Sequence, residues 1–417
     1  MPQRRLLVLD DDPLIGRTIQ FIAQGVGLAA RYTHDPGEFF AVLAEWEPTH
    51  VALDLVMPGM DGVEVLVQLA QRNCRARIII TSGMGGRVLD AAGRSGVEHG
   101  LDILGVLPKP FSASMLRALL DQAPGTAMAE LPALARGNPI DGAYSRPTGE
   151  ISAEAMSRAL EDRQFSVVYQ PKVVCDGGML AGFEVLARWH HPTLGEIPPD
   201  RFIAVAERHD LIDELTAQVL DQSLQWFARH APESRPPALG DPVTLSVNLS
   251  ARSLRSHQLV ETLTSRCQAH GVDPSRIVLE LTETSAMEDP VASLDMLTRL
   301  RMKGFNLSLD DFGTGYSSML QLVRLPFSEI KIDKSFVMEA TRSGEARSVI
   351  RSIVDLGHSL GLQVTAEGVE TAETLHYLQD TRCDLAQGFH IARPMPGERA
   401  LLWLQRHTEK FANPSRG

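Results

Sequence analysis

Paired cysteines, long apolar runs and basic stretches are all missing from this 417-residue sequence. The four cysteines, at positions 74, 175, 267 and 383, form no CxxC pair, which excludes a disulfide framework and the usual zinc motifs. No stretch approaches the roughly 18 apolar residues of a membrane span, and the N-terminal apolar run is too short for a signal peptide. We therefore expect a cytoplasmic protein that does not associate with a membrane.

The charge balance is acidic, with 40 Lys and Arg against 52 Asp and Glu and a net charge of -12. No basic run offsets this charge, which argues against DNA as a partner. An anionic ligand still fits where bound cations reverse the local field. The length and the hydrophobic fraction of 44% are typical of two globular domains.

Residues 1–121 alternate short apolar strands with helical patterns. The predicted strands are Leu6–Leu9, Ala30–Tyr32, Val51–Leu55, Ile78–Thr81 and Ile103–Leu107. This alternation predicts an α/β domain with a doubly wound, flavodoxin-like parallel sheet. Residues 122–150 are rich in Pro, Gly and Ala without a sustained period, which predicts a linker.

Residues 151–410 predict a second, larger domain. Its eight strand-like segments are SVVYQ, GFEVLARW, TLSVNLS, RIVLELTE, NLSLDDFG, EIKIDKS, QVTAEGVE and LAQGFHI. Helical stretches separate most of them, as in a TIM-like (β/α)8 barrel. Only a short turn at residues 175–178 joins the first two segments, so the first strand should run antiparallel to the second, with Gln170 opposite Glu184.

Each of these strands carries a polar residue at or near its end. These residues are Gln170, Glu184, Asn248, Glu280, Asp310, Lys331, Glu367 and Gln387. The C-terminal strand ends of such a barrel converge, so we expect one site. The candidate ligands offer only oxygen atoms, which suit Mg²⁺ or Mn²⁺ and not zinc: Glu184, Asn248, Glu280, Asp310, Asp311 and Glu367. Two cations shared by Asp310 and Asp311 would relieve the repulsion among these carboxylates and polarise a phosphoryl group, with Lys331 placed to steady the attacking water.

These segments closely resemble the EAL domain, a family of cyclic-di-GMP phosphodiesterases, over residues 155–405. The signature triplet is Glu184-Val185-Leu186, with Val in place of the middle Ala, and the motifs DDFGTGYSS, KID, AEGVE and AQGF are also present. The resemblance implies hydrolysis of cyclic-di-GMP to linear pGpG at a site that holds two Mg²⁺ or Mn²⁺ ions. It gives catalytic roles to Glu184, Lys331, Asp310, Asp311 and Glu367, and metal ligation to the six residues named above.

The resemblance also implies the residues that surround the substrate. They are Gln170, Leu186, Arg188, Asp333, Glu370 and Gln387. Glu283 would anchor the loop that begins at Asp310, which the family uses to couple metal binding, dimerisation and activity. We therefore expect a homodimer or a higher homo-oligomer.

Polar residues gather at strand ends in the N-terminal domain as well. They are Asp10, Asp11, Asp54, Thr81 and Lys109, and they would share one crevice of a doubly wound sheet. The three carboxylates suit one Mg²⁺ or Mn²⁺, while Thr81 and Lys109 could steady a phosphoryl group on Asp54. Together with LDLVMPGMDG and LPKPF, this set resembles the receiver domain of two-component response regulators, which implies phosphorylation of Asp54 by a sensor histidine kinase. Val106 departs from the aromatic switch residue usual in receivers, which puts the usual threonine–aromatic coupling in question.

These patterns support two hypotheses of different classes. The first is a response regulator whose output is cyclic-di-GMP hydrolysis, and the second is a non-catalytic cyclic-di-GMP sensor or docking protein. The complete ligand set favours the enzyme. A kinase interpretation of Asp311-Phe312-Gly313 fails because no glycine-rich loop or HRD motif accompanies it, and no GGDEF-like segment is present.

Overall fold

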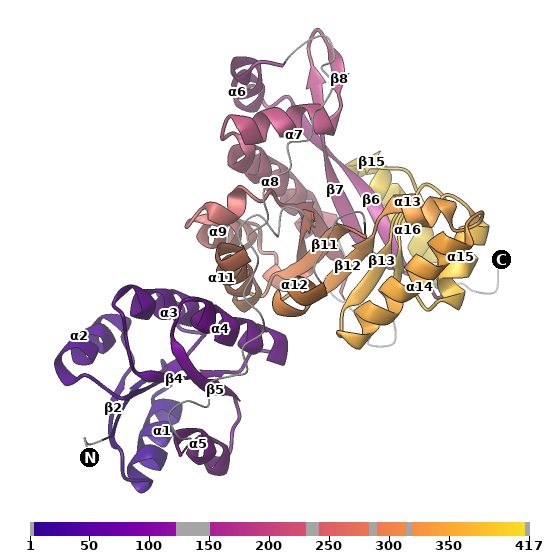
Figure 1. Cartoon of the computed structure of the whole chain (residues 1–417). Coiled ribbons are helices and arrows are strands. Elements are labelled where there is room, and N and C mark those ends of the chain that lie inside the picture. The colour runs from indigo at the N-terminus through magenta and orange to yellow at the C-terminus, as the bar shows by residue number, and fades with distance from the viewer. Residues whose placement is uncertain (1–3, 122–150, 231–241, 283–289, 314–318, 413–417) are drawn as a thin grey trace. The chain divides into compact units, whose positions relative to one another are not determined.

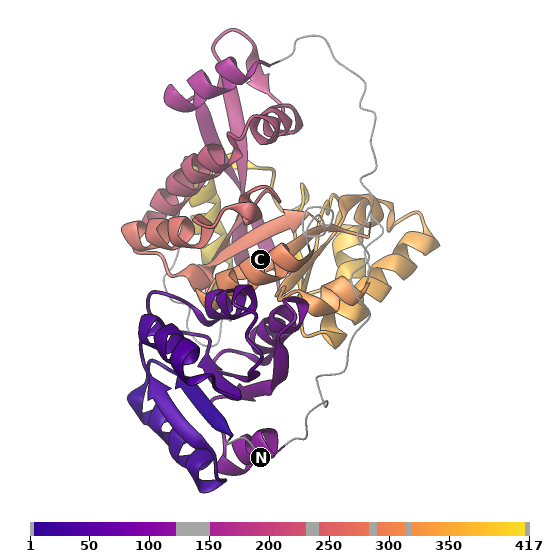
Figure 2. The same cartoon turned by 60° about the vertical axis from the view of Figure 1, so that its left-hand side comes forward.

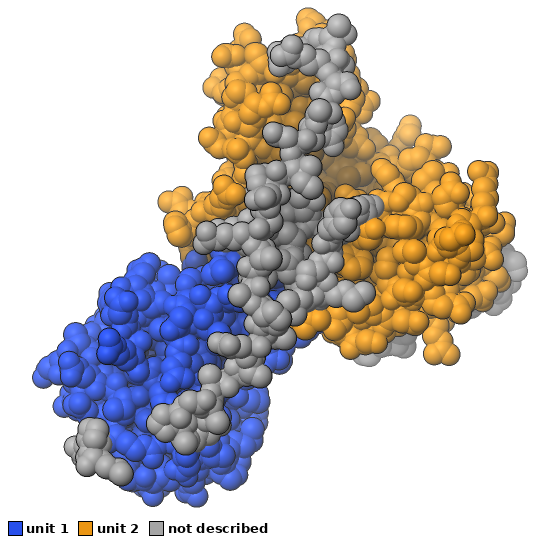
Figure 3. All heavy atoms as spheres, viewed as in Figure 1, with its two compact units in different colours: residues 1–137, 290–302, 324–326 blue, residues 138–289, 303–323, 327–417 orange. Residues whose placement is uncertain are grey.

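The computed structural model describes residues 4–121, 151–230, 242–282, 290–313 and 319–412. The chain forms two compact units (Figure 3). Unit 1 comprises residues 1–137, 290–302 and 324–326, and unit 2 comprises residues 138–289, 303–323 and 327–417. Three sequence predictions lie outside the described residues: the linker at 122–150, Glu283 as loop anchor, and the TGYSS end of the DDFGTGYSS loop.

Unit 1 contains a five-stranded parallel sheet in the order β2-β1-β3-β4-β5. Its strands are β1 (Arg5–Leu9), β2 (Ala29–Thr33), β3 (His50–Asp54), β4 (Arg77–Ser82) and β5 (Asp102–Pro108). Helices α1 (Pro13–Gly25) and α5 (Ala113–Leu120) cover one face, and α2 (Pro36–Trp46), α3 (Gly62–Gln71) and α4 (Gly86–Glu98) cover the other (Figure 1). This strand order is that of flavodoxin-like folds, which confirms the predicted doubly wound sheet.

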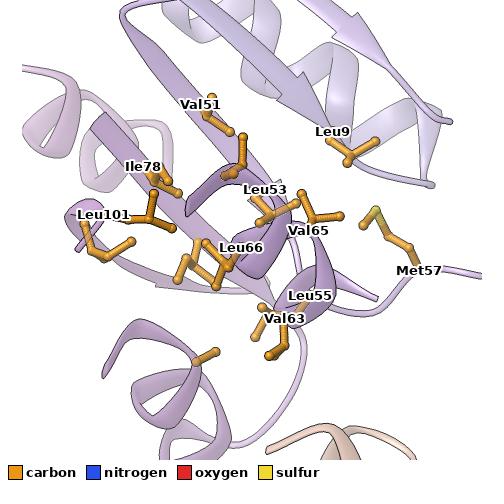
Figure 4. Packing of buried hydrophobic residues seen from close by; sticks show 14 of the residues in the cluster. Leu9, Val51, Leu53, Leu55, Met57, Val63, Val65, Leu66, Ile78 and Leu101 are labelled. Atoms are coloured by element: carbon orange, nitrogen blue, oxygen red, sulfur yellow. The ribbon is translucent and has the colours of Figure 1, made fainter. Parts of the chain in front are cut away.

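The apolar runs of the central strands fill both faces of this sheet. Leu7 and Leu9 of β1 point into the cluster beneath α2, α3 and α4, whereas Leu6 and Val8 point into the cluster beneath α1 and α5. Figure 4 shows the first cluster, where Leu9 and side chains of β3 pack against those of α3. All four β1 side chains are 0% exposed, and each such burial contributes about 1.5–3 kcal/mol.

Short polar side chains start the helices that leave the strand ends. Asp12, Asp35, Asp61 and Ser112 each accept a backbone N–H in the first turn of α1, α2, α3 and α5. Such a cap stabilises a helix by about 0.5–2 kcal/mol. The Asp12 carboxylate therefore caps α1, whereas the Asp10 and Asp11 carboxylates lie close to Asp54 at the strand ends.

Unit 2 is a closed barrel of eight strands, as predicted. Its strands are β6 (Phe165–Val174), β7 (Leu180–His191), β9 (Thr244–Asn248), β10 (Ile277–Thr282), β11 (Asn306–Phe312), β12 (Glu329–Ile332), β13 (Gln363–Ala366) and β14 (Leu385–Ala386). Strand β6 runs antiparallel to both β7 and β14, while the remaining barrel pairs are parallel. Gln170 pairs directly with Glu184, which confirms the predicted hairpin register.

The prediction that Gln170 and Glu184 lie at strand ends is wrong. Both lie inside long strands, because β6 and β7 continue past the barrel and β7 pairs there with β8 (Gly195–Ile197). Figures 1 and 2 show these strands projecting beside α6 (Ala153–Glu161) and α7 (Pro199–Arg208). Glu184 still faces the site. Side chains along a strand alternate between its two faces, and Glu184 lies on the inward face of β7.

Helices surround the barrel. They are α8 (Ile212–His230), α9 (Leu259–His270), α12 (Met319–Arg324), α13 (Lys334–Glu339), α14 (Gly344–Ser359), α15 (Ala372–Asp380) and α16 (Gly397–Ala412). The chain between β10 and β11 forms α11 (Pro290–Met302), whose residues group with unit 1. No helix in the described part of the chain is long and apolar enough to cross a bilayer.

Candidate active site

Lys331 of β12 is the centre of the acidic site in unit 2. Its Nζ lies 2.6 Å from Glu367 Oε1, 2.7 Å from Glu280 Oε2 and 3.2 Å from Asp310 Oδ1. Glu184 Oε2 is 3.8 Å away. The Lys331 side chain is 0% exposed. This ammonium group is a fixed positive charge among four carboxylates, three of them from strands β7, β10 and β11 and the fourth, Glu367, from the residue after β13.

Amide side chains orient Glu184. Asn248 Nδ2 donates to Glu184 Oε1 at 3.3 Å, and Gln387 Nε2 donates to Glu184 Oε2 at 2.5 Å. Gln387 Nε2 also lies 3.0 Å from Gln170 Oε1, and Gln170 Nε2 donates to the Ala392 carbonyl oxygen. Both ends of the Glu184 carboxylate are thereby held in place by side chains that the sequence predicts for this site.

The backbone turns at Asp310 and Asp311. Consecutive residues of a regular strand point to opposite faces, but Asp311 has a φ of 55° and the β11–β12 register shifts between Leu309 and Phe312. This irregularity lets carboxylate oxygens of Asp310, Asp311 and Glu367 lie within 4.8 Å of one another. Such bulges recur next to active sites, where they redirect side chains.

Burial is the main cause of the raised pKa values of these carboxylates, and their mutual repulsion adds to it. Burial, opposed by Lys331, raises the pKa of Glu367 to about 8. Burial and the neighbouring charge of Asp310 raise the pKa of Asp311 to about 6, and burial also raises the pKa values of Glu184 and Asp310. Lys331 thus offsets only part of the cost of burying these charged carboxylates.

The donor set fits divalent cations that prefer oxygen. Carboxylates and one amide are the available ligands, as Mg²⁺ and Mn²⁺ require. Oε1 of Glu280 is buried and accepts no hydrogen bond of regular geometry from the residues that the structure describes. Its polar neighbours are the Ser246 hydroxyl and the Lys172 ammonium, and neither of these contacts saturates its lone pairs. Added positive charge would also relieve the repulsion that raises the neighbouring pKa values.

The structure brings some of the predicted substrate residues together and leaves others apart. Leu186, Arg188 and Asn248 line one cavity of about 220 Å³. Arg188 Nε lies 3.7 Å from Glu196 Oε1. Asp333 caps α13 through Ser335, and its carboxyl hydrogen-bonds to Asp311. Glu370 is exposed.

Sequence reasoning missed a buried polar layer below this site. It consists of Lys172, Ser246, Glu329 and Thr365, all at most 4% exposed. Lys172 lies two residues after Gln170, and Glu329 lies two residues before Lys331, so each shares the inward face of its strand. That spacing was the available signal.

The predicted receiver residues also meet, at the C-terminal ends of the strands of unit 1. Oxygens of Asp10, Asp11 and Asp54 lie within 4.8 Å of one another, and Lys109 Nζ lies 2.9 Å from both Asp10 Oδ2 and Asp54 Oδ2. Burial raises the pKa values of Asp10 and Asp54 despite this lysine. Thr81 is buried and its hydroxyl donates weakly to the Leu53 carbonyl oxygen at 3.4 Å.

The fold and the two sites define a receiver-type domain joined to a TIM-like barrel with a lysine-centred acidic site. The family model of the EAL domain matches residues 153–394, and that of the response regulator receiver domain matches residues 6–121. The chain belongs to the EAL domain family and carries a receiver domain, as its motifs predict.

Relatives and solved structures agree with this assignment. The chain is 36% identical over 415 residues to the cyclic di-GMP phosphodiesterase RocR of Pseudomonas aeruginosa, a match that covers 96% of this chain and 98% of that protein. It is 40% identical over 251 residues to the bifunctional diguanylate cyclase/cyclic di-GMP phosphodiesterase MucR of the same organism, a match over 59% of this chain and only 35% of MucR. A solved structure of the PaMucR phosphodiesterase in complex with c-di-GMP superposes with a TM-score of 0.55 at 39% identity, covering 59% of this chain and 98% of that one.

Proposed function

We propose that this chain is a response regulator that hydrolyses cyclic-di-GMP to linear pGpG. The observation that carries the proposal is the ring of Glu184, Glu280, Asp310 and Glu367 around the buried Lys331, with Asp311 turned toward the same site. Water would add to one phosphorus of the cyclic dinucleotide, and the bond from that phosphorus to a ribose 3′ oxygen would break. One proton of the water passes to the leaving 3′ oxygen and the other stays with the oxygen added to phosphorus, which gives a 5′ phosphate and a 3′ hydroxyl.

The ligand residues Glu184, Asn248, Glu280, Asp310, Asp311 and Glu367 would hold two Mg²⁺ or Mn²⁺ ions. Such a pair supplies Lewis-acid activation of a phosphoryl group and of water. Lys331 is held by its carboxylates in one place, so its ammonium can orient the attacking water or steady the charge that develops on phosphorus.

The cavity beside the ligands supports recognition of an anionic dinucleotide. Its lining combines the Arg188 guanidinium with apolar side chains such as Leu186, and Arg is well suited to phosphate contacts. Gln170 and Gln387 would complete the substrate's surroundings, and Asp333 and Glu370 are proposed to contact it once it is bound.

The receiver would control this activity. Asp54 is proposed to accept a phosphoryl group from a sensor histidine kinase, with one Mg²⁺ or Mn²⁺ at Asp10 and Asp11. The contacts of Lys109 with Asp10 and Asp54 support this role, because an ammonium group there can neutralise phosphoryl oxygens. A homodimer or higher homo-oligomer stays a prediction.

Turnover of cyclic-di-GMP by the purified full-length chain with Mg²⁺ or Mn²⁺ tests the proposal. We expect pGpG to accumulate, and Glu184→Ala to abolish it while the variant remains folded. Binding of cyclic-di-GMP without any pGpG would instead establish the alternative of a non-catalytic sensor. Comparing Asp54→Ala with the parent chain before and after treatment with a small phosphodonor tests the regulatory part separately.

A further inference from the structure

The buried layer below the proposed metal ligands contains an ion pair with no part in the proposed chemistry. Lys172 of β6 is 1% exposed and Glu329 of β12 is 4% exposed. Lys172 Nζ donates to Ser246 Oγ at 2.7 Å and to Glu329 Oε1 at 3.3 Å. Thr365 Oγ1 donates to the same Glu329 oxygen at 2.7 Å. Side chains from four strands therefore fix this pair inside the barrel.

Glu280 lies between this pair and the site. Its Oε2 accepts from Lys331 at 2.7 Å, whereas its Oε1 lies 3.6 Å from Lys172 Nζ. The second distance is too long for a hydrogen bond. Lys172 thus places a positive charge beside Glu280 while it gives its hydrogen bonds to Ser246 and Glu329.

We propose that Lys172 and Glu329 are positioning residues for the metal site. Glu329 holds the Lys172 ammonium away from Glu280, so that Glu280 Oε1 stays open to a cation. The inference rests on the proposed function, since it concerns the ligand set of that site. Groups beyond the ligands commonly tune metal sites in this way, and their loss weakens metal affinity about 10- to 100-fold.

Removal of Glu329 should redirect the Lys172 ammonium. The ammonium loses its closest carboxylate, and Glu280 at 3.6 Å is the nearest one left to it. A charge-assisted hydrogen bond would then form and occupy the oxygen that a cation needs. Removing Lys172 as well would free that oxygen again, and replacing a buried pair by apolar residues of similar volume is often tolerated.

A role in folding alone predicts a different pattern. If the pair only filled the barrel interior, each further substitution would damage the site, and the double variant would bind cations no better than the single one. Positioning predicts that the second substitution rescues the first. The two interpretations therefore differ in whether the Lys172 substitution strengthens or weakens Mn²⁺ binding when Glu329 is already replaced.

The experiment is a Mn²⁺ titration of full-length variants, with free Mn²⁺ followed by electron paramagnetic resonance. All variants carry Asp11→Ala, which removes a carboxylate from the receiver's cluster. We expect Glu329→Leu to raise the Kd for Mn²⁺ about 10- to 100-fold, and Lys172→Met with Glu329→Leu to return it to within about threefold of the parent. Glu339→Leu, an equal charge change at an exposed position, should leave it unchanged.

Unchanged Mn²⁺ binding in Glu329→Leu would overturn the inference. A double variant that binds Mn²⁺ more weakly than the single variant would also overturn it. Thermal unfolding checks that each variant is folded. If Glu329→Leu fails to fold, Glu329→Gln takes its place. We then expect a smaller rise in the Kd for Mn²⁺, and an unchanged Kd would contradict the inference. Hydrolysis by the parent chain is measured in parallel, because a parent that never produces pGpG refutes the proposed function, whereas an active parent with the wrong coupling refutes only the positioning role.

Discussion

Replacing Lys331 by Met is the most direct test of the charge balance in the barrel. The variant leaves Glu184, Glu280, Asp310 and Glu367 without the ammonium that lies 2.6–3.8 Å from them. Breaking a buried ionic network by removing one partner costs about 3–5 kcal/mol. Glu367, with a pKa raised to about 8, can stay protonated at neutral pH, which places our expectation at the lower end, about 3 kcal/mol.

Urea unfolding in EDTA measures this loss. Three of the four tryptophans lie in residues 151–410, so intrinsic fluorescence reports mainly on the barrel. Mn²⁺ should recover stability more strongly in Lys331→Met than in the parent chain, because the cations replace the missing charge. Hydrolysis should fall at least about 100-fold, as on removal of a donor that stabilises developing charge.

Lys334→Met is the matched control, since Lys334 is exposed three residues further along the chain. It should stay within about 0.5 kcal/mol of the parent chain. A Lys331→Met variant as stable as the parent in EDTA would refute the charge argument. Activity within a few fold of the parent would refute the assignment of Lys331 to the reaction.

Individual side chains give three further predictions. The pKa of about 8 for Glu367 predicts that Mn²⁺ binding near pH 7 releases about one proton. Calorimetry in buffers of different ionisation enthalpy measures this proton release. Identical apparent enthalpies in all buffers would contradict the prediction. Burial and two nearby arginines lower the pKa of His50 from 6.5 to about 4, so its contribution to stability, about 3 kcal/mol, is complete above pH 6.5 and is lost as the pH falls through 4. His50→Asn should remove that part of the acid sensitivity in thermal unfolding, and an unchanged pH profile argues against it. A β-carbon on Gly388 would lie 2.2 Å from backbone atoms of Val369, so Gly388→Ala should cost more than about 2 kcal/mol and impair hydrolysis, whereas Gly344→Ala, with open space around it, should be tolerated.

The sequence allowed the architecture and most of the site to be predicted, because both depend on local patterns. Alternating apolar strands and helical periods indicate the sheet and the barrel, and the Cys175–Gly178 turn indicates the antiparallel first strand. The meeting of Glu184 with Lys331 results from topology, since inward-facing side chains of different strands converge inside a closed barrel. These features need no knowledge of packing.

Other features depend on tertiary structure and escaped prediction. The strand predicted at residues 182–189 continues to His191, where β7 pairs with the short strand β8 that the sequence did not indicate. The left-handed backbone of Asp311 is uncommon for a residue other than glycine, and it coincides with the register shift between β11 and β12. Lys172 and Glu329 escape a prediction based on strand ends because they lie one layer deeper in the barrel, two residues from Gln170 and Lys331.

The polar interior predicts that folding and cation binding are linked in this barrel. Glu184, Asp310 and Glu367 all have raised pKa values because burial penalises their charge more than Lys331 favours it. Glu280 is the exception: Lys331 and Lys172 outweigh its burial and lower its pKa. The lysines thus favour the charged form of Glu280, whereas burial disfavours the charged forms of the other three carboxylates, and bound cations would oppose that effect of burial. A barrel with an apolar interior would be simpler to stabilise. It would lack the lysines that favour the charged form of a buried metal-binding carboxylate such as Glu280.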